Sequence, residues 1–175
     1  FGYFTSAPLT AYSSSGTAFG TTISTLYYFL VKYNSSGIIQ WIANIGGTGQ
    51  TNQNSLTCDT NGNVIVTCTG GGITPLNSDG TSYTGSGILG AYRVNGFIVY
   101  YNTSGTIQWV ATFAGGSRFW NQAISVDSSG NVYCSGYSLG GFAQPYNASG
   151  TGMFTVAGAR GQNGYIVKYT SAGSN

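Results

Sequence analysis

The stretch from Phe97 to Trp109 limits the possible folds of this chain because it recurs at a fixed distance. It reads FIVYYNTSGTIQW, and the earlier segment from Phe29 to Trp41 matches it at nine of thirteen positions. The same stretch begins again as YIVKYTSAG, from Tyr165 to Gly173. The three copies start at positions 29, 97 and 165, so the period is sixty-eight. A fixed period of this length is typical of a repeat architecture.

The period divides the chain into four parts that together form one structural domain. Residues 29–96 and 97–164 are two full repeats, and residues 165–175 begin a third. Residues 1–28 resemble the end of a repeat, because Pro8-Leu9-Thr10 lines up with Pro75-Leu76-Asn77 and with Pro145-Tyr146-Asn147.

Apolar and polar residues alternate inside each repeat with the two-residue period of a β-strand. In the first repeat a strand starting at Phe29 leads through the turn Ser35-Ser36-Gly37 into a strand that places Ile39, Trp41, Ala43 and Ile45 on one face. Leu56 and Cys58 are expected to point inward, and the turn 59–63 leads to a strand over 64–68. A weaker fourth strand is expected between Ser82 and Tyr92. The pattern predicts an all-β fold of antiparallel, four-stranded repeats.

The order of these elements resembles that of a known family. A Gly-x-Ile-Gln-Trp strand followed by an Asp-x-x-Gly-Asn-Val turn and a Pro-containing segment is similar to the bacterial β-propeller repeat of the SBBP type. The chain departs from that pattern at the start of each repeat, where Phe29, Phe97 and Tyr165 follow Tyr or Gly rather than an Asp-Ala pair. The resemblance implies that each repeat is a blade of a β-propeller-like fold.

Charge excludes several classes of function. The chain has five Lys or Arg, three Asp, no Glu and no His, for a net charge of +2. Such sparse positive charge does not suit nucleic acid or an acidic membrane surface. No apolar run is long enough to span a bilayer. With no His, no Glu and no paired carboxylates, we expect no enzyme activity and no cofactor.

The three aspartates are predicted to cap turns rather than to do chemistry. Asp59 and Asp127 are one period apart and each precedes a turn glycine, and Asp79 lies in a Ser-Asp-Gly turn. Aspartate favours such turns because its side chain hydrogen-bonds the local backbone. Residues 59–63 resemble a calcium loop but lack the later acidic ligand, so we predict no metal site.

The cysteines and tryptophans each have a structural and a functional interpretation. Cys58 and Cys134 stand where the other repeat has valine, which favours small buried side chains over a disulfide or metal site, and the same is expected of Cys68. Trp41 and Trp109 are expected to pack in the core, on the face of Ile39 and Ile107. The alternative is that they stack on sugars together with Trp120, which we expect in a loop as an exposed contact.

Three Asn-x-Ser/Thr sequences are candidate glycosylation sites, because each lies in a predicted turn. The acceptor residues are Asn34, Asn102 and Asn147. Chance matches are also expected in a chain so rich in Asn, Ser and Thr.

Incomplete repeats at both ends suggest self-assembly. Strand edges without a partner pair readily with another chain, so the end of one molecule is expected to complete the start of the next. The low charge removes the repulsion that would oppose such packing. The residues expected to make the contact are Phe1, Tyr3, Phe4, Leu9, Tyr165, Ile166, Val167 and Tyr169.

The leading hypothesis is therefore a non-enzymatic structural subunit of an extracellular filament or surface appendage, with copies of itself as partners and adhesion as a secondary role. Because the chain starts at Phe1 rather than Met, a processed product or a fragment is expected. Two alternatives stay open. One is a carbohydrate-binding, lectin-like propeller assembled from a few copies, and the other is a fragment of a longer secreted propeller.

Overall fold

The computed structural model describes residues 1–4, 8–23, 27–46, 54–70, 72–87, 94–115, 118–140, 142–157 and 161–174. All regular structure in these residues is β-strand, and every strand pair is antiparallel. The prediction of an antiparallel all-β fold is confirmed. Within this described part of the chain there is no helix that could cross a membrane.

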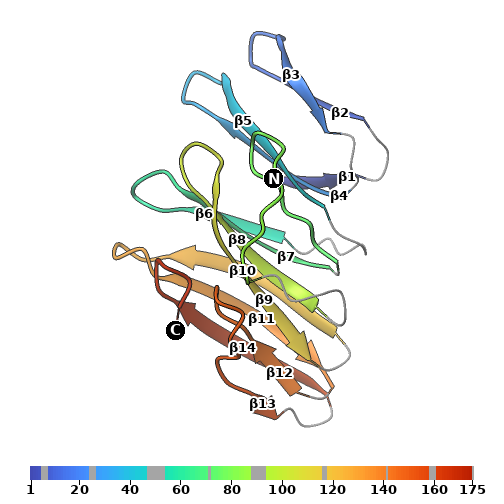
Figure 1. Ribbon diagram of the computed structural model, residues 1–175, viewed down its shortest axis with the longest axis vertical. Coiled ribbons are helices and arrows are strands. Elements are labelled where there is room, and N and C mark those ends of the chain that lie inside the picture. Colours follow the sequence, from blue (N-terminus) through green and yellow to red (C-terminus); the bar gives the residue numbers. More distant parts are fainter. Residues whose placement is uncertain are drawn as a thin grey trace.

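Three sheets are stacked face to face along the long axis of the molecule (Figure 1). The first sheet has the order β1-β4-β5 and consists of β1 (Gly2–Phe4), β4 (Tyr27–Tyr33) and β5 (Ile39–Gly46). A separate hairpin of β2 (Leu9–Tyr12) and β3 (Ala18–Ile23) packs on it.

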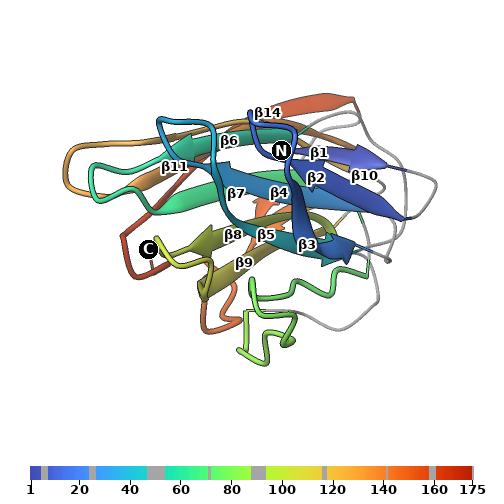
Figure 2. The same ribbon diagram turned by 90° about the horizontal axis from the view of Figure 1, so that it is seen from above.

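The central sheet has six strands in the order β13-β12-β9-β8-β7-β6. They are β6 (Asn54–Cys58), β7 (Val64–Thr69), β8 (Val94–Tyr101), β9 (Ile107–Gly115), β12 (Phe142–Pro145) and β13 (Val156–Ala157). The third sheet has the order β10-β11-β14, with β10 (Arg118–Val126), β11 (Val132–Leu139) and β14 (Gln162–Tyr169). Seen along the stack, strands of successive sheets overlie one another (Figure 2).

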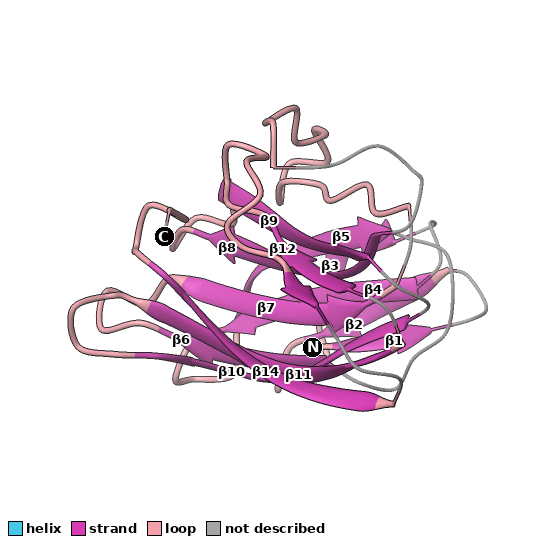
Figure 3. Cartoon of the chain, turned by 90° about the horizontal axis from the view of Figure 1, so that it is seen from below, coloured by secondary structure: helices cyan, strands magenta, loops and turns pink. Residues whose placement is uncertain are grey.

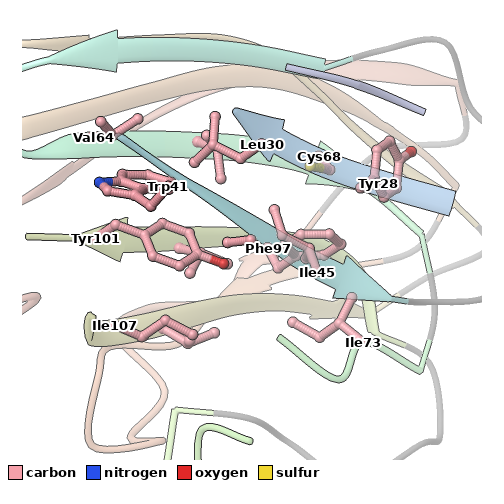
Figure 4. Packing of buried hydrophobic residues seen from close by; sticks show 14 residues of the cluster. Tyr28, Leu30, Trp41, Ile45, Val64, Cys68, Ile73, Phe97, Tyr101 and Ile107 are labelled. Carbon is pink, nitrogen blue, oxygen red and sulfur yellow. The ribbon is translucent and has the colours of Figure 1, made fainter. Parts of the chain in front are cut away.

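Two hydrophobic cores hold the stack together, one at each contact between sheets. We call the contact between the first and central sheets the first joint, and the contact between the central and third sheets the second joint. The first joint buries Tyr28, Trp41 and Ile45 against Phe97 and Tyr101, together with smaller side chains (Figure 4). The second joint buries Trp109 and Phe113 of the central sheet against Phe119, Val167 and Tyr169 of the third.

The sheets do not coincide with the sequence repeats. The central sheet combines β6 and β7 from residues 29–96 with β9 and most of β8 from residues 97–164. Likewise, the third sheet combines β10 and β11 with β14, which belongs mostly to residues 165–175. Consecutive strands such as β5 and β6 lie in different sheets, so the chain passes from one sheet to the next within each repeat.

The expectation that Ile39 and Ile107 share a face with the tryptophans is wrong. Pairing between β4 and β5 is irregular between Lys32 and Tyr33, and pairing between β8 and β9 is irregular at the corresponding place. The extra residue of a β-bulge reverses the alternation of side chains beyond it. Ile39 therefore packs against the β2–β3 hairpin, on the opposite side from Trp41.

Three further expectations about individual elements need correction. Leu56 and Cys58 are exposed rather than inward-facing, because β6 is the outermost strand of its sheet. Trp120 lies in strand β10 and not in a loop. The expected fourth strand is represented only by an isolated bridge between Leu76 and Ser82, and residues 88–92 of that range lie outside the described residues.

Candidate functional site: the joints and the exposed ends of the stack

The first joint is closed at its turn end by a lysine and a tryptophan from the first sheet. The indole Nε1 of Trp41 donates to the backbone O of Thr103 at 2.9 Å, and its ring lies 5.8 Å from that of Tyr101. Lys32 Nζ lies over the same indole at 5.9 Å and donates to the backbone O of Gly62 at 2.8 Å and of Thr103 at 3.3 Å. Side chains of one sheet thus hold the turns of the next.

The second joint repeats this arrangement with one change. Trp109 Nε1 donates to the backbone O of Ser171 at 3.0 Å, and its ring stacks on Tyr169 at 6.0 Å. In the position of the lysine stands Tyr100, one period further along the chain, which stacks on Trp109 at 5.2 Å. Its hydroxyl donates to Asp59 Oδ2 in its own sheet, at 2.7 Å, and so does not reach the third sheet.

Backbone bonds between turns accompany each tryptophan. The N–H of Ser78 donates to Gly105 O at 2.9 Å, and that of Ala148 donates to Gly173 O at 2.9 Å. The N–H of Ser14 donates to Gly37 O at 3.0 Å in the same way. The turn that starts at Ser13 therefore corresponds to the one that starts at Asn77. The alignment on the prolines instead pairs Asn77 with Thr10, three residues before Ser13.

The outer face of the third sheet exposes positions that the other sheets bury. Figure 3 shows the strands of this sheet, β10, β11 and β14, together at one side of the molecule. Ile166 on β14 is 73% exposed, whereas its counterparts Leu30 and Ile98 are 2% and 0% exposed. Lys168 stands in the repeat position of the first-joint lysine, and its Nζ lies 5.6 Å over the ring of Tyr133. A shallow pocket of about 300 Å³ is lined on this face by Ala123, Ile124, Ser125, Tyr133, Cys134, Ser135 and Ile166.

At the opposite end of the stack, the first sheet exposes a tyrosine whose counterparts in the other two sheets are buried. Tyr33 is 45% exposed, although its counterparts Tyr101 and Tyr169 are fully buried under the tryptophan of the preceding sheet. Its hydroxyl donates to the backbone O of Tyr12 at 3.2 Å. The β2–β3 hairpin covers the neighbouring Phe29 but leaves Tyr33 accessible.

The eight residues predicted to make subunit contacts fall into different environments. Val167 and Tyr169 belong to the core of the second joint and are buried within the chain itself, so their side chains are not available to a partner. Tyr165 packs on that same core. Phe1 packs against Tyr28, and Phe4 and Leu9 pack in the cluster under the hairpin. Only Tyr3 and Ile166 of the eight are exposed.

The aspartates cap turns, as their positions predict. Asp127 Oδ1 accepts from the backbone N–H groups of Ser129 and Asn131, each at 2.9 Å, and bonds from Asn131 lower the pKa of this carboxyl. Burial alone would raise the pKa of Asp59, but hydrogen bonds from Tyr100 and Asn63 lower it. Among the described residues no cluster of three or more side chains suits a metal ion.

The tryptophans offer little surface to a sugar. Tyr100 and Tyr169 stack on Trp109, and Lys32 and Tyr101 pack on the ring of Trp41. Both indoles are nearly fully buried, so the structural interpretation holds for them. Trp120 is half-buried on the third sheet and stacks on Tyr137 at 4.7 Å.

The three candidate glycosylation residues have the same local structure. Asn34, Asn102 and Asn147 each accept, through Oδ1, from the backbone N–H groups two and four residues ahead. Asn34 is exposed and the other two are half-buried. Asparagine thus stabilises each turn, and the side chain of Asn34 is the most accessible of the three.

One position of the repeat differs between the copies and bears on the joints. Positions 32, 100 and 168 read Lys, Tyr and Lys, although the residues around them are largely preserved. Only the structure reveals that Lys32, at this position, spans the gap between neighbouring sheets, whereas Tyr100 bonds within its own sheet.

Comparison with known proteins adds no assignment. A scan against models of protein families finds no match, and a search of curated proteins finds no significant relative. Any function must therefore be argued from the joints and the two ends of the stack.

Proposed function

We propose that this chain is a structural subunit of an extracellular filament or surface appendage, and that it assembles head to tail with copies of itself. The outer face of the third sheet would pack against the Tyr33 end of the next copy. The observation that carries the proposal is the exposure of Ile166 and Tyr33 at opposite ends of the stack, where each has two buried counterparts.

The two internal joints provide the pattern for this contact. Each joins a Leu or Ile on one sheet, together with a tryptophan, to a tyrosine on the next. Burying one such aliphatic side chain contributes about 1.5–3 kcal/mol to the free energy of association. Packing Ile166 against the next copy is therefore favourable. A contact that uses different surfaces on its two sides extends into a ring or an open helix, depending on the rotation between copies.

Lys168 supports the same geometry. At the first joint its counterpart Lys32 donates to turn carbonyls of the following sheet. The turn that corresponds to Thr103 in the first sheet begins at Asn34 and contains Ser35. In the proposed contact Lys168 leaves the ring of Tyr133 and donates to the backbone O of Ser35 in the next copy.

The edge of β14 supplies backbone groups for strand pairing. Its counterparts β4 and β8 pair on both sides, the second time with β5 and β9 respectively. Within the described residues β14 pairs only with β11. Unpaired strand edges accept strands from other chains, so we include pairing at this edge in the assembly. We further propose that the stacked sheets are blades of a propeller-like arc, as the resemblance to the SBBP-type repeat implies.

Two variants that each block one end test the proposal. Ile166→Asp places a charge on the third-sheet face, and Tyr33→Asp places one at the other end. We expect the wild-type protein to form long fibres or large rings in electron micrographs. Each variant alone should remain monomeric, and an equimolar mixture should form heterodimers and nothing larger, because one intact joint remains.

The matched control is Leu56→Asp, a charge introduced at an exposed side chain on the sheet edge, away from both ends. It should assemble like the wild type. Analytical ultracentrifugation from about 10 to 500 µM covers the range of moderate protein affinities. A wild-type protein that stays monomeric throughout, or single variants that still polymerise, would rule out head-to-tail assembly through these faces.

A further inference from the structure

We propose that the second joint contains a binding site for a primary ammonium group. The site is a pocket of about 440 Å³ at the turn end of this joint. It is lined by Asn63, Tyr100, Asn102, Gln108, Trp109, Ser171 and Ala172. The site does not depend on self-assembly, because all the residues that line it belong to one chain.

The first joint indicates the chemistry, because there a lysine ammonium group donates to Thr103 O, the counterpart of the Ser171 carbonyl at the pocket. Lys32 Nζ donates to Gly62 O and Thr103 O and lies over Trp41. The carbonyls one period further along the chain are those of Gly130 and Ser171. In the described residues Ser171 O receives the indole N–H of the second-joint tryptophan, and no lysine reaches either carbonyl.

Tyr100 places an aromatic ring, and no ammonium group, over the indole of the second joint. Its hydroxyl turns toward its own sheet, donating to Asp59 Oδ2 at 2.7 Å and accepting from Asn63 Nδ2 at 3.1 Å. Its ring still covers one face of the tryptophan, as the lysine does at the first joint. The substitution of tyrosine for lysine thus keeps the aromatic stack but removes the ammonium group.

The lining favours a cationic donor over other small ligands. Gln108 Nε2 donates to Thr106 O at 3.1 Å, which leaves its Oε1 as an acceptor at the pocket. The Ser171 carbonyl is a second acceptor, and the Asp59 carboxylate lies one hydrogen bond beyond Tyr100. No lining residue carries positive charge. A sugar would need an open indole face, and Tyr100 and Tyr169 stack on that of Trp109.

The tryptophan indole N–H signals in a ¹⁵N-edited NMR titration report on the site directly. The probe is Nα-acetyl-lysine amide, which carries the same four-carbon ammonium arm as Lys32. We expect the Trp109 signal to shift and saturate at probe concentrations on the order of 1 mM, typical of a single-group ligand. The Trp41 signal should not move, because Lys32 already occupies that joint.

Three comparisons make the test specific. Nα-acetyl-norleucine amide, which lacks the charge, should not shift Trp109. Gln108→Leu should weaken binding several-fold, whereas Gln40→Leu, the same change at the first joint, should not. Tyr100→Lys should abolish binding, because it supplies an internal ammonium group. If that variant fails to fold, the comparison of Gln108→Leu with Gln40→Leu still tests the site.

The source of the ammonium group is distinguished by a second probe, 1,4-diaminobutane. Tighter binding of the acetylated lysine indicates a lysine side chain of another protein, and tighter binding of the diamine indicates a free polyamine. The site is overturned if Trp109 does not shift, if Trp41 shifts equally, or if the norleucine compound acts like the lysine one.

Discussion

Gly37, Gly105 and Gly173, in the turns that follow β4, β8 and β14, lie where neighbouring turns meet. Gly105 has φ +82°, and a Cβ added there would lie 2.6 Å from Cβ of Ser78 and 2.9 Å from Cδ2 of Trp41. Gly80, in the adjoining turn, has φ +85°, but a Cβ there would meet nothing within 4 Å. The two positions share a backbone conformation and differ in packing.

This pair separates backbone strain from steric exclusion. Gly80→Ala is expected to destabilise the fold by about 1–2 kcal/mol, because an L-residue disfavours positive φ. Gly105→Ala should add about 1–3 kcal/mol more, since the tryptophan and serine must move. Thermal unfolding of the two variants measures the difference. Equal melting temperatures would mean that the close contacts of Gly105 with Ser78 and Trp41 add no cost to the substitution.

Burial of a thiol predicts sensitivity to alkaline pH. Burial raises the pKa of Cys134 to about 12 from an ordinary value of 9.0, while the contact with Thr67 lowers it. The unfolded chain ionises this thiol first, so its contribution to stability is intact below pH 9 and is lost as pH rises toward 12.

Cys134→Val tests this, because valine occupies the corresponding position 66 in the first repeat. The variant should match the wild type near pH 7 and lose less stability between pH 9 and pH 11, as measured by urea unfolding at each pH. Parallel decline of the two proteins would show that the Cys134 thiol does not contribute to alkaline unfolding.

Among the elements, β10 combines a bulge with a buried polar network. Its pairing with β11 shifts between Asn121 and Ala123, and Asn121 is fully buried. Asn121 Nδ2 donates to Thr67 Oγ1 at 2.8 Å, its backbone N–H donates to Thr69 Oγ1 at 3.0 Å, and its Oδ1 accepts from the Tyr165 hydroxyl. One residue therefore connects the central sheet to two strands of the third.

Removing this side chain should weaken the second joint. Asn121→Ala removes the side-chain hydrogen bonds to the buried hydroxyl groups of Thr67 and Tyr165, and each such bond contributes about 0.5–1.5 kcal/mol. Gln122→Ala, at the exposed neighbouring position, should change stability by less than about 0.5 kcal/mol. Urea unfolding of both variants provides the comparison. A loss for Asn121→Ala no larger than that for Gln122→Ala would contradict the role of the network.

Alternation of side chains located most strands but missed the bulges. Strands β5, β7 and β9 begin where the sequence predicts them, at Ile39, Val64 and Ile107. The bulges beside Gln40 and Gln108 were missed because one extra residue leaves the surrounding pattern intact while reversing which face it presents. Strand β10 has an irregularity of the same kind, between Asn121 and Ala123.

At the scale of the whole molecule, the two joints share most of their contacts. Tryptophan, tyrosine and a turn carbonyl recur at both, but lysine closes the first joint and tyrosine leaves a pocket at the second. The outer faces present the same positions once more, with Ile166 at one end and Tyr33 at the other. In the proposed assembly, a similar joint forms a third time, between molecules.

Local sequence is sufficient to define the period, the antiparallel strands and the capped turns. These features depend on short-range alternation, on glycine and on aspartate side chains close in the chain, so they can be identified without knowing the fold. The grouping of strands into sheets needs the three-dimensional arrangement, because a periodic sequence can be divided at any point. The same arrangement buries Val167 and Tyr169 while leaving Ile166 exposed, since burial depends on which sheet lies across each face.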